Sequence, residues 1–293
     1  MRPTTLVPAL TLALALGACA STAPSEPASA SPSQAAPVVA AMPAADTAAL
    51  AAAIAGAWRD PKNVARDVYR HPQQTLAFFG VEPGHTVIEI TPGGGWYAEI
   101  LAPYLREDGE YVAAVWDDAI AGQPKYRYDL NKTLRAKFAG NPAVFGTPDV
   151  RVFDPKAPVF GADNAADVVL TFRNAHNWVG DGNAAAYFNA FFAALKPGGV
   201  LGVVDHRARP GADLDTMKKS GYLTEALVIE LAQAAGFVLE ASSEVNANPR
   251  DTADHPNGVW TLPPSNNHDD ADDAKYKAIG ESDRMTLRFR KPR

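Results

Sequence analysis

Two histidines stand directly after apolar runs in the second half of the chain, where catalytic side chains are expected. His176 follows the run 166–172, and His206 follows the next such run. Because imidazole titrates near neutral pH, each is a candidate general base, a group that takes a proton from a substrate. Arg173 and Asn174 add polar groups beside His176. A structural hydrogen bond is the alternative role for each histidine, and both roles stay open.

A glycine-rich turn is the second place that suggests chemistry. The apolar run 86–91 contains Glu89 and ends at Thr91, and it is followed by Pro92, Gly93, Gly94 and Gly95. Glycine tolerates positive φ and has no Cβ, so the backbone can turn sharply and leave room for a ligand. A predicted helix from 96 to 105 would point its free N–H groups at that ligand. The carboxylate of Glu89 could accept hydrogen bonds from hydroxyl or amino groups, which indicates a nucleotide-like ligand. The alternative is a tight strand-to-helix turn with no ligand.

From Thr86 onward, predicted strands alternate with predicted helices, and these elements must position the candidate residues. Short apolar runs separated by helical stretches predict a doubly wound, mostly parallel α/β sheet of the Rossmann-like type. Ligands of such sheets bind at the carboxyl ends of the strands, where the candidate residues gather. The predicted strands are 86–91, 111–116, 150–153, 166–172, 199–205, 237–244 and 285–291, and the predicted helices are 96–105, 129–139, 182–195 and 223–235.

Three further segments carry polar groups. Residues 66–72 are densely polar and precede a predicted helix at 73–79, so they form either a lid over the site or a solvated helix. The long irregular stretch 246–284 is typical of a functional or disordered loop. Its acidic run 269–273 could bind Ca²⁺ through carboxylate oxygens, but the start of a solvated helix is the favoured interpretation. No metal site is therefore expected. The basic residues of 284–293 alternate, which suggests the exposed face of a strand.

Composition narrows the class of protein. The chain has 293 residues, 47% of them hydrophobic, with a net charge of -6 and a pI of about 5.5. A nucleic-acid partner is not expected, because binding faces are normally basic. The single Cys, Cys19, excludes an intramolecular disulfide and a Cys-rich metal site.

The N-terminal region resembles a bacterial lipoprotein signal. Residues 1–18 have a basic start and an apolar run too short for a permanent membrane span. The run ends at Cys19, the position at which such proteins are lipidated. Residues 19–45 are almost all Ala, Pro and Ser, which predicts a disordered tether to a domain at 46–293. Because Ala20 follows the cysteine, the resemblance implies an outer-membrane anchor facing the periplasm.

The order of elements resembles a class I S-adenosylmethionine (SAM) dependent methyltransferase over roughly residues 60–293. Residues 89–95 match the family's acid-x-Gly-x-Gly-x-Gly turn at Glu89, Gly93 and Gly95. Residues 195–201, LKPGGVL, resemble the entry to its fifth strand, and residues 166–170 resemble its fourth. The resemblance implies an antiparallel last strand. More narrowly, residues 92–97, 173–178 and 282–285 look like a bacterial group of predicted methyltransferases.

The resemblance also implies roles for particular residues. SAM would contact the turn, Glu89 to Gly95, with Tyr97 and Arg173 on the wall of the pocket. Asn174 would position the acceptor or the methionine end of SAM, and Trp178 would also wall the pocket. Two departures stand out. Thr91 replaces the first glycine of the turn, and Val115 stands where an acid should hold the ribose, so Asp117 is the substitute. Asp154 fits the adenine contact.

Three functions are compatible with this pattern. The first is SAM-dependent methyl transfer to a small-molecule or lipid-like acceptor, although SAM is made in the cytosol and the anchor lies in the envelope. The second is a non-catalytic envelope lipoprotein that binds another ligand. The third is a nicotinamide oxidoreductase, whose Gly-x-Gly-x-x-Gly fingerprint would need glycine where Ala98 stands.

Overall fold

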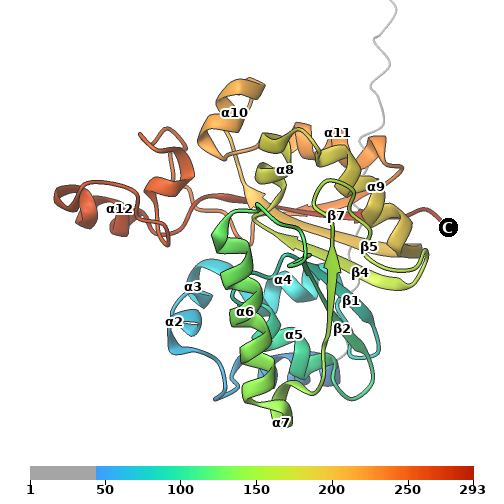
Figure 1. The fold of residues 1–293 in the computed structure, drawn as a ribbon. Coiled ribbons are helices and arrows are strands. Elements are labelled where there is room, and N and C mark those ends of the chain that lie inside the picture. The colour runs from blue at the N-terminus through green and yellow to red at the C-terminus, as the bar shows by residue number, and fades with distance from the viewer. Residues whose placement is uncertain (1–43) are drawn as a thin grey trace, which may run out of the picture. The chain divides into compact units, whose positions relative to one another are not determined.

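A computed structural model describes residues 44–293, and it contains a single seven-stranded sheet flanked by helices (Figure 1). The proposed signal peptide, Cys19 and nearly all of the tether lie outside the described residues. Within residues 44–293, no helix is both long enough and apolar enough to cross a membrane.

The sheet has the order β3-β2-β1-β4-β5-β7-β6. The first five strands in that order are parallel, while β7 runs antiparallel to both β5 and β6. This confirms the predicted fold class, including the antiparallel last strand. The strands are β1 (Thr86–Ile90), β2 (Glu110–Trp116), β3 (Asp149–Phe153), β4 (Ala166–Phe172), β5 (Leu195–His206), β6 (Val238–Ser243) and β7 (Arg284–Arg290).

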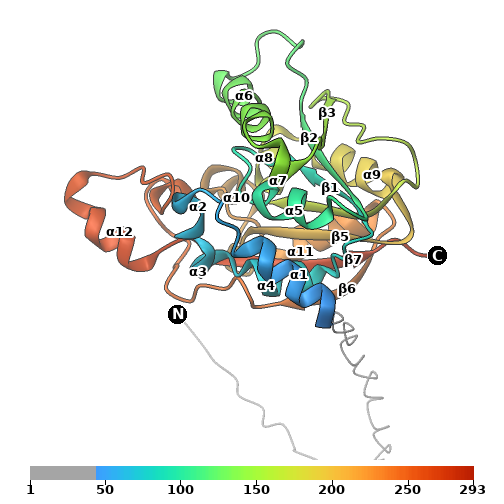
Figure 2. The same ribbon diagram turned by 90° about the horizontal axis from the view of Figure 1, so that it is seen from below.

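Helices cover both faces of the sheet, so the strands are apolar on both sides. In β1, Ile88 and Ile90 belong to the core beneath α8, α9 and α11, while Val87 belongs to the core shared with α1, α4 and α5 (Figures 1 and 2). The helices of the N-terminal half are α1 (Ala44–Ile54), α2 (Pro61–Val64), α3 (Asp67–Arg70), α4 (Pro72–Phe79), α5 (Ala98–Leu105), α6 (Lys125–Gly140) and α7 (Pro142–Phe145). Those of the C-terminal half are α8 (Ala175–Asp181), α9 (Ala184–Ala194), α10 (Leu214–Ser220), α11 (Glu225–Ala234) and α12 (Asp273–Ile279), with 3-10 turns η1 (Gly258–Thr261) and η2 (Asp270–Asp272).

Two of the three basic residues of β7, Arg284 and Arg288, are buried, which corrects the prediction of an exposed strand face. Arg284 and Arg288 are 2% and 7% exposed, because β7 lies between two other strands rather than at an edge. Arg288 is neutralised by Glu240, at 2.7 Å, and donates to the carbonyl of Phe78 on α4. The alternating basic residues of β7 therefore do not mark a solvent-facing side of the strand, because Arg288 is paired with an acid on the neighbouring strand β6.

Candidate functional site

Two cavities adjoin at the carboxyl ends of β1, β4 and β5. The first, of about 360 Å³, is lined by the turn after β1 and is called the turn cavity. The second, of about 380 Å³, contains both candidate histidines and is called the histidine cavity. Tyr126, Arg173 and Asn177 line both cavities. Two ligands bound side by side would therefore share this wall.

The turn after β1 opens its backbone towards the first cavity. Gly93 has φ 60°, and a Cβ added to Gly93 or Gly94 would meet no atom within 4 Å. Both glycines line the turn cavity, whereas Gly95 packs against Leu134. Thr91 also adopts the left-handed region, at φ 46°, although this conformation is unfavourable for a β-branched residue. The turn thus keeps the glycine geometry even where threonine replaces glycine.

Glu89 presents a buried carboxyl group to the same cavity. It is 3% exposed, and the hydroxyl of Tyr111 donates to it at 2.6 Å. Burial raises the pKa of Glu89 to about 7, against smaller lowering effects of the Tyr111 hydrogen bond and of Arg70. At neutral pH the group therefore exchanges between a hydrogen-bond donor and an anion, both of which suit hydroxyl or amino groups of a ligand.

Aromatic rings and an amide complete the wall of the turn cavity. Tyr97 stacks on Phe172 with ring centroids 3.7 Å apart, and both line the cavity. Trp116, at the end of β2, also lines it and was not predicted. Asn174 donates to the carbonyl of Ile90 at 3.0 Å, so it ties the ends of β4 and β1 together. The predicted Trp178 lies elsewhere, in the hydrophobic core, stacked on Tyr187.

Two predicted acids are not among the residues that line the turn cavity. Asp117 accepts from the backbone N–H of Ala119 at 2.9 Å, in a turn just beyond β2. Asp154 accepts from the backbone N–H of Lys156 at 2.8 Å and lines a separate cavity. Their roles in ribose and adenine contacts stay predictions.

The segment before α4 lies at the turn cavity, as expected for a lid. Asn63, Arg66 and Arg70 line that cavity, and Trp96 donates from its indole N–H to the carbonyl of Asn63 at 2.9 Å. The guanidinium of Arg70 lies 4.7 Å from the Trp96 ring. These contacts fix the segment against the glycine turn.

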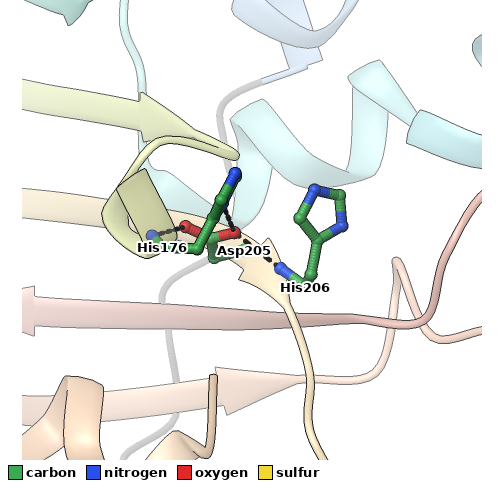
Figure 3. A group of neighbouring side chains, drawn as sticks. All are labelled: His176, Asp205 and His206. Atoms are coloured by element: carbon green, nitrogen blue, oxygen red, sulfur yellow. Dashed lines mark hydrogen bonds and ion pairs between the residues drawn. The ribbon is translucent and has the colours of Figure 1, made fainter. Parts of the chain in front are cut away.

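The histidines meet at the ends of β4 and β5, and Figure 3 shows the group they form with Asp205. Phe172 is paired with Val204, so the residues that follow each strand come together. The fully buried Asp205 accepts from Nδ1 of His176 at 2.9 Å and from the backbone N–H of His206 at 2.7 Å. Because the carboxylate is the acceptor, Nδ1 of His176 carries the proton and Nε2 keeps its lone pair.

The two histidines differ in their surroundings. Nδ1 of His206 lies 2.5 Å from Oγ of Ser282, and the two imidazole centroids are 5.0 Å apart. Burial, followed by the neighbouring His176, lowers the pKa of His206 well below its ordinary value. His206 is therefore neutral at pH 7 and a weak proton acceptor. Within residues 44–293, no hydrogen bond uses Nε2 of His176, which lines the cavity.

The same three residues are the types that bind transition metals. One potential ligand atom from each of His176, Asp205 and His206 lies within 4.8 Å of the others. However, the two Asp205 oxygens already accept three hydrogen bonds from the two histidines. The carboxylate thus orients His176 in this arrangement. A carboxylate that accepts a hydrogen bond from a histidine ring N–H commonly fixes the orientation of that ring.

A cluster of arginines gives the turn cavity a positive edge. Burial alone would raise the pKa of Glu281, but Arg284, Arg70, Arg173 and Arg66 hold it well below its usual range. Burial, followed by the neighbouring Arg284, lowers the pKa of Arg173 to about 10. Glu281, Ser282 and Trp260 were not predicted as site residues, because they lie in the irregular stretch 246–284.

The chain has the fold of class I SAM-dependent methyltransferases. A SAM-dependent methyltransferase from Aquifex aeolicus is 16% identical, with 79% of this chain and 94% of that chain covered and a TM-score of 0.52. A candidate sarcosine dimethylglycine methyltransferase from Galdieria sulphuraria is 15% identical, with 80% and 88% covered and a TM-score of 0.53. The [4+2]-cyclase SpnF is 15% identical, with 84% and 93% covered and a TM-score of 0.53. No protein-family model and no curated protein matches the sequence.

Proposed function

We propose that this chain is a SAM-dependent methyltransferase of the bacterial lipoprotein-signal group that the sequence resembles. The observation that carries the proposal is the pair of adjoining cavities with Arg173 and Asn177 in their common wall. One cavity holds the glycine turn, and the other holds a histidine oriented by a buried acid. This arrangement suits a donor and an acceptor held side by side, which is most of what methyl transfer requires.

The residues of the turn cavity fit SAM. Gly93 and Gly94 leave an open backbone face, and Glu89 offers a carboxyl group to amino or hydroxyl groups. Thr91 and Tyr97 would complete the contact. When bound, SAM supplies a methyl group already activated by its positively charged sulfur.

His176 is the residue best placed to act as general base. Nε2 would take the proton of an acceptor hydroxyl, amine or carbon acid in the histidine cavity. Asp205 would stabilise the resulting imidazolium through the 2.9 Å contact to Nδ1. Asn174 would hold the junction of the two cavities, and neutral His206 would act as a hydrogen-bonding partner.

Calorimetric titration of SAM and S-adenosylhomocysteine into the purified full chain tests the proposal. We expect micromolar binding that is lost in Gly93→Val. The matched control is Gly182→Val, because Gly182 has φ 75° and open space at its Cβ position. Folded protein that binds neither compound at millimolar concentration would contradict the proposal.

The second candidate function is ligand binding without catalysis. Thr91 favours it, because a strained threonine replaces glycine at the turn. The [4+2]-cyclase also has this fold, so the fold alone does not fix the reaction. Under this alternative, SAM would not bind and the cavities would hold an envelope ligand.

We place the protein in the cell envelope, anchored by lipid at Cys19 and facing the periplasm from the outer membrane. Support comes from the apolar run, the lone cysteine and the Ala/Pro/Ser tether. The acceptor would be a small or lipid-like molecule, with no nucleic-acid partner. Mass spectrometry of the mature N-terminus should find acylated Cys19, and Cys19→Ser should release the protein from membranes. An unmodified N-terminus at another residue would exclude the anchor.

A further inference from the structure

Four arginines gather around one carboxylate, and three of them line the turn cavity. Nε of Arg66 lies 2.5 Å from Glu281, and Nε of Arg70 lies 3.4 Å from it. Arg284 also pairs with Glu281, and Arg173 raises the local positive charge further. A single acid cannot neutralise four guanidinium groups, so the cluster has positive charge to spare.

Several of these guanidinium groups have donors without partners. Nη2 of Arg66, Nη2 of Arg70 and Nε of Arg284 are buried and make no hydrogen bond among the described residues. Arg70 is only 4% exposed, and it lines the turn cavity. Buried donors without acceptors are costly, so these groups favour a ligand that brings hydrogen-bond acceptors.

Arg173 is the member of the cluster placed between the two cavities. Within residues 44–293, its side chain makes no hydrogen bond or ion pair, and it lines both cavities. Its backbone has φ 60°, in the region that normally favours glycine, and its N–H donates to the carbonyl of Val204 at 2.7 Å. A strained backbone conformation of this kind is typical of functional positions.

The other charges nearby do not remove the excess. Asp205 is engaged with His176, and Glu89 is partly neutral at pH 7 because burial raises its pKa to about 7. SAM would add its own net positive charge, since its ammonium and sulfonium outweigh its carboxylate. Because Arg66, Arg70 and Arg173 line the cavity proposed for SAM, these like charges repel each other unless an anion lies beside them.

We infer that the methyl acceptor is an anion, with a carboxylate or phosphate group that Arg173 binds in the histidine cavity. This inference rests on the proposed function. Arginine suits both groups because its planar donors match their paired oxygens. Arg66, Arg70 and Arg284 supply the surrounding positive potential. The acceptor would thus lie with its charged end on Arg173 and its nucleophile at His176, which lines the same cavity.

Calorimetry with simple anions on the full chain tests the inference. Inorganic phosphate and acetate are titrated separately, alone and with saturating SAM or S-adenosylhomocysteine, at constant ionic strength set by chloride. We expect at least one anion to bind at about millimolar Kd and to tighten SAM binding about tenfold, which corresponds to about 1.4 kcal/mol. The anion that binds identifies the acceptor class as phosphate or carboxylate.

Variants decide which residue is responsible. Arg173→Gln should abolish the anion effect, and any loss of S-adenosylhomocysteine affinity should be smaller than the loss of anion affinity. Arg173→Lys should restore part of it, whereas Arg135→Gln, on the exposed side of α6, should behave as wild type. Thermal unfolding checks that each variant is folded.

Three outcomes would overturn the inference. One is no binding of either anion to folded wild-type protein. Another is equal anion binding by Arg173→Gln. The third is that Arg173→Gln loses S-adenosylhomocysteine affinity instead, which would assign Arg173 to the donor's own carboxylate. If S-adenosylhomocysteine itself fails to bind, the proposed function fails, while the anion titrations still test Arg173.

Discussion

Replacing Thr91 with glycine should stabilise the protein. Thr91 is held at φ 46°, and its hydroxyl is buried without a hydrogen-bond partner among residues 44–293. Glycine adopts this backbone conformation at no steric cost, and the N–H that donates to the Ala114 carbonyl at 2.8 Å is retained. The change therefore removes strain without removing a backbone hydrogen bond.

The expected gain follows from opposing contributions. Relief of the strained φ is worth about 1–3 kcal/mol. Loss of the buried methyl group costs about 0.8 kcal/mol, and the greater freedom of glycine in the unfolded chain costs about 0.4–1 kcal/mol. These three contributions to the free energy of unfolding sum to between about −0.8 and +1.8 kcal/mol. Removal of the unpaired buried hydroxyl adds about 1–3 kcal/mol, which makes the expected net change a gain.

Urea unfolding followed by circular dichroism measures this change, and calorimetry measures S-adenosylhomocysteine affinity in the same samples. We expect affinity to stay within about threefold, because Gly93 and Gly94 form the open backbone face. Ala253→Gly is the matched control, since Ala253 has φ 54° but no hydroxyl. A loss of more than about 1 kcal/mol in Thr91→Gly would refute the strain argument and indicate that the threonine side chain holds the turn together.

Three other substitutions give separate expectations. Gly93→Val should abolish SAM binding in a folded protein, because valine is strained at φ 60° and would fill the cavity; unchanged affinity by calorimetry would show that the turn is not the site. Glu89→Gln should raise the free energy of unfolding at pH 8 by about 3 kcal/mol and leave it unchanged near pH 4, since the unfolded carboxyl loses its proton near 4.5 and the folded one near 7. Stability of the wild type should therefore fall between those pH values in urea titrations, and a pH-independent difference from Glu89→Gln would exclude the raised pKa. His176→Ala should lower the rate of SAM turnover by about 10²–10⁴ with little change in SAM affinity, whereas an unfolded variant would indicate a structural role.

The central strands β1, β2, β4 and β5 could be predicted from the sequence because they are buried on both faces. A strand covered by helices on both sides appears as a continuous apolar run, and turns separate the runs clearly. The short helices α8 and α10 have seven residues each, too few for a helical period to show. The burial of β7 could not be predicted, since Glu240, the acid that neutralises Arg288, lies in a different strand.

The site residues that lie at strand ends could be predicted from the sequence. The contacts that depend on how neighbouring strands are paired could not. His176 follows β4 and His206 is the last residue of β5, so their location at the carboxyl ends of the strands followed from the fold. That Asp205 orients His176 depends on the pairing of Phe172 with Val204, which the sequence does not contain. Trp116 precedes the predicted Asp117 by one residue, and only the path of the chain after β2 decides which of them lines the cavity.

The position of β7 has a consequence for the order of assembly. This strand comes after every other strand in the chain, yet it separates β5 from β6. Until it is synthesised, β5 and β6 have no partner between them, and Glu281, Ser282 and Arg284 are absent from the site. A nascent chain therefore cannot form the native sheet or its arginine cluster early. Under the proposed envelope location, this late completion would keep the chain unfolded long enough to cross the inner membrane as an extended chain.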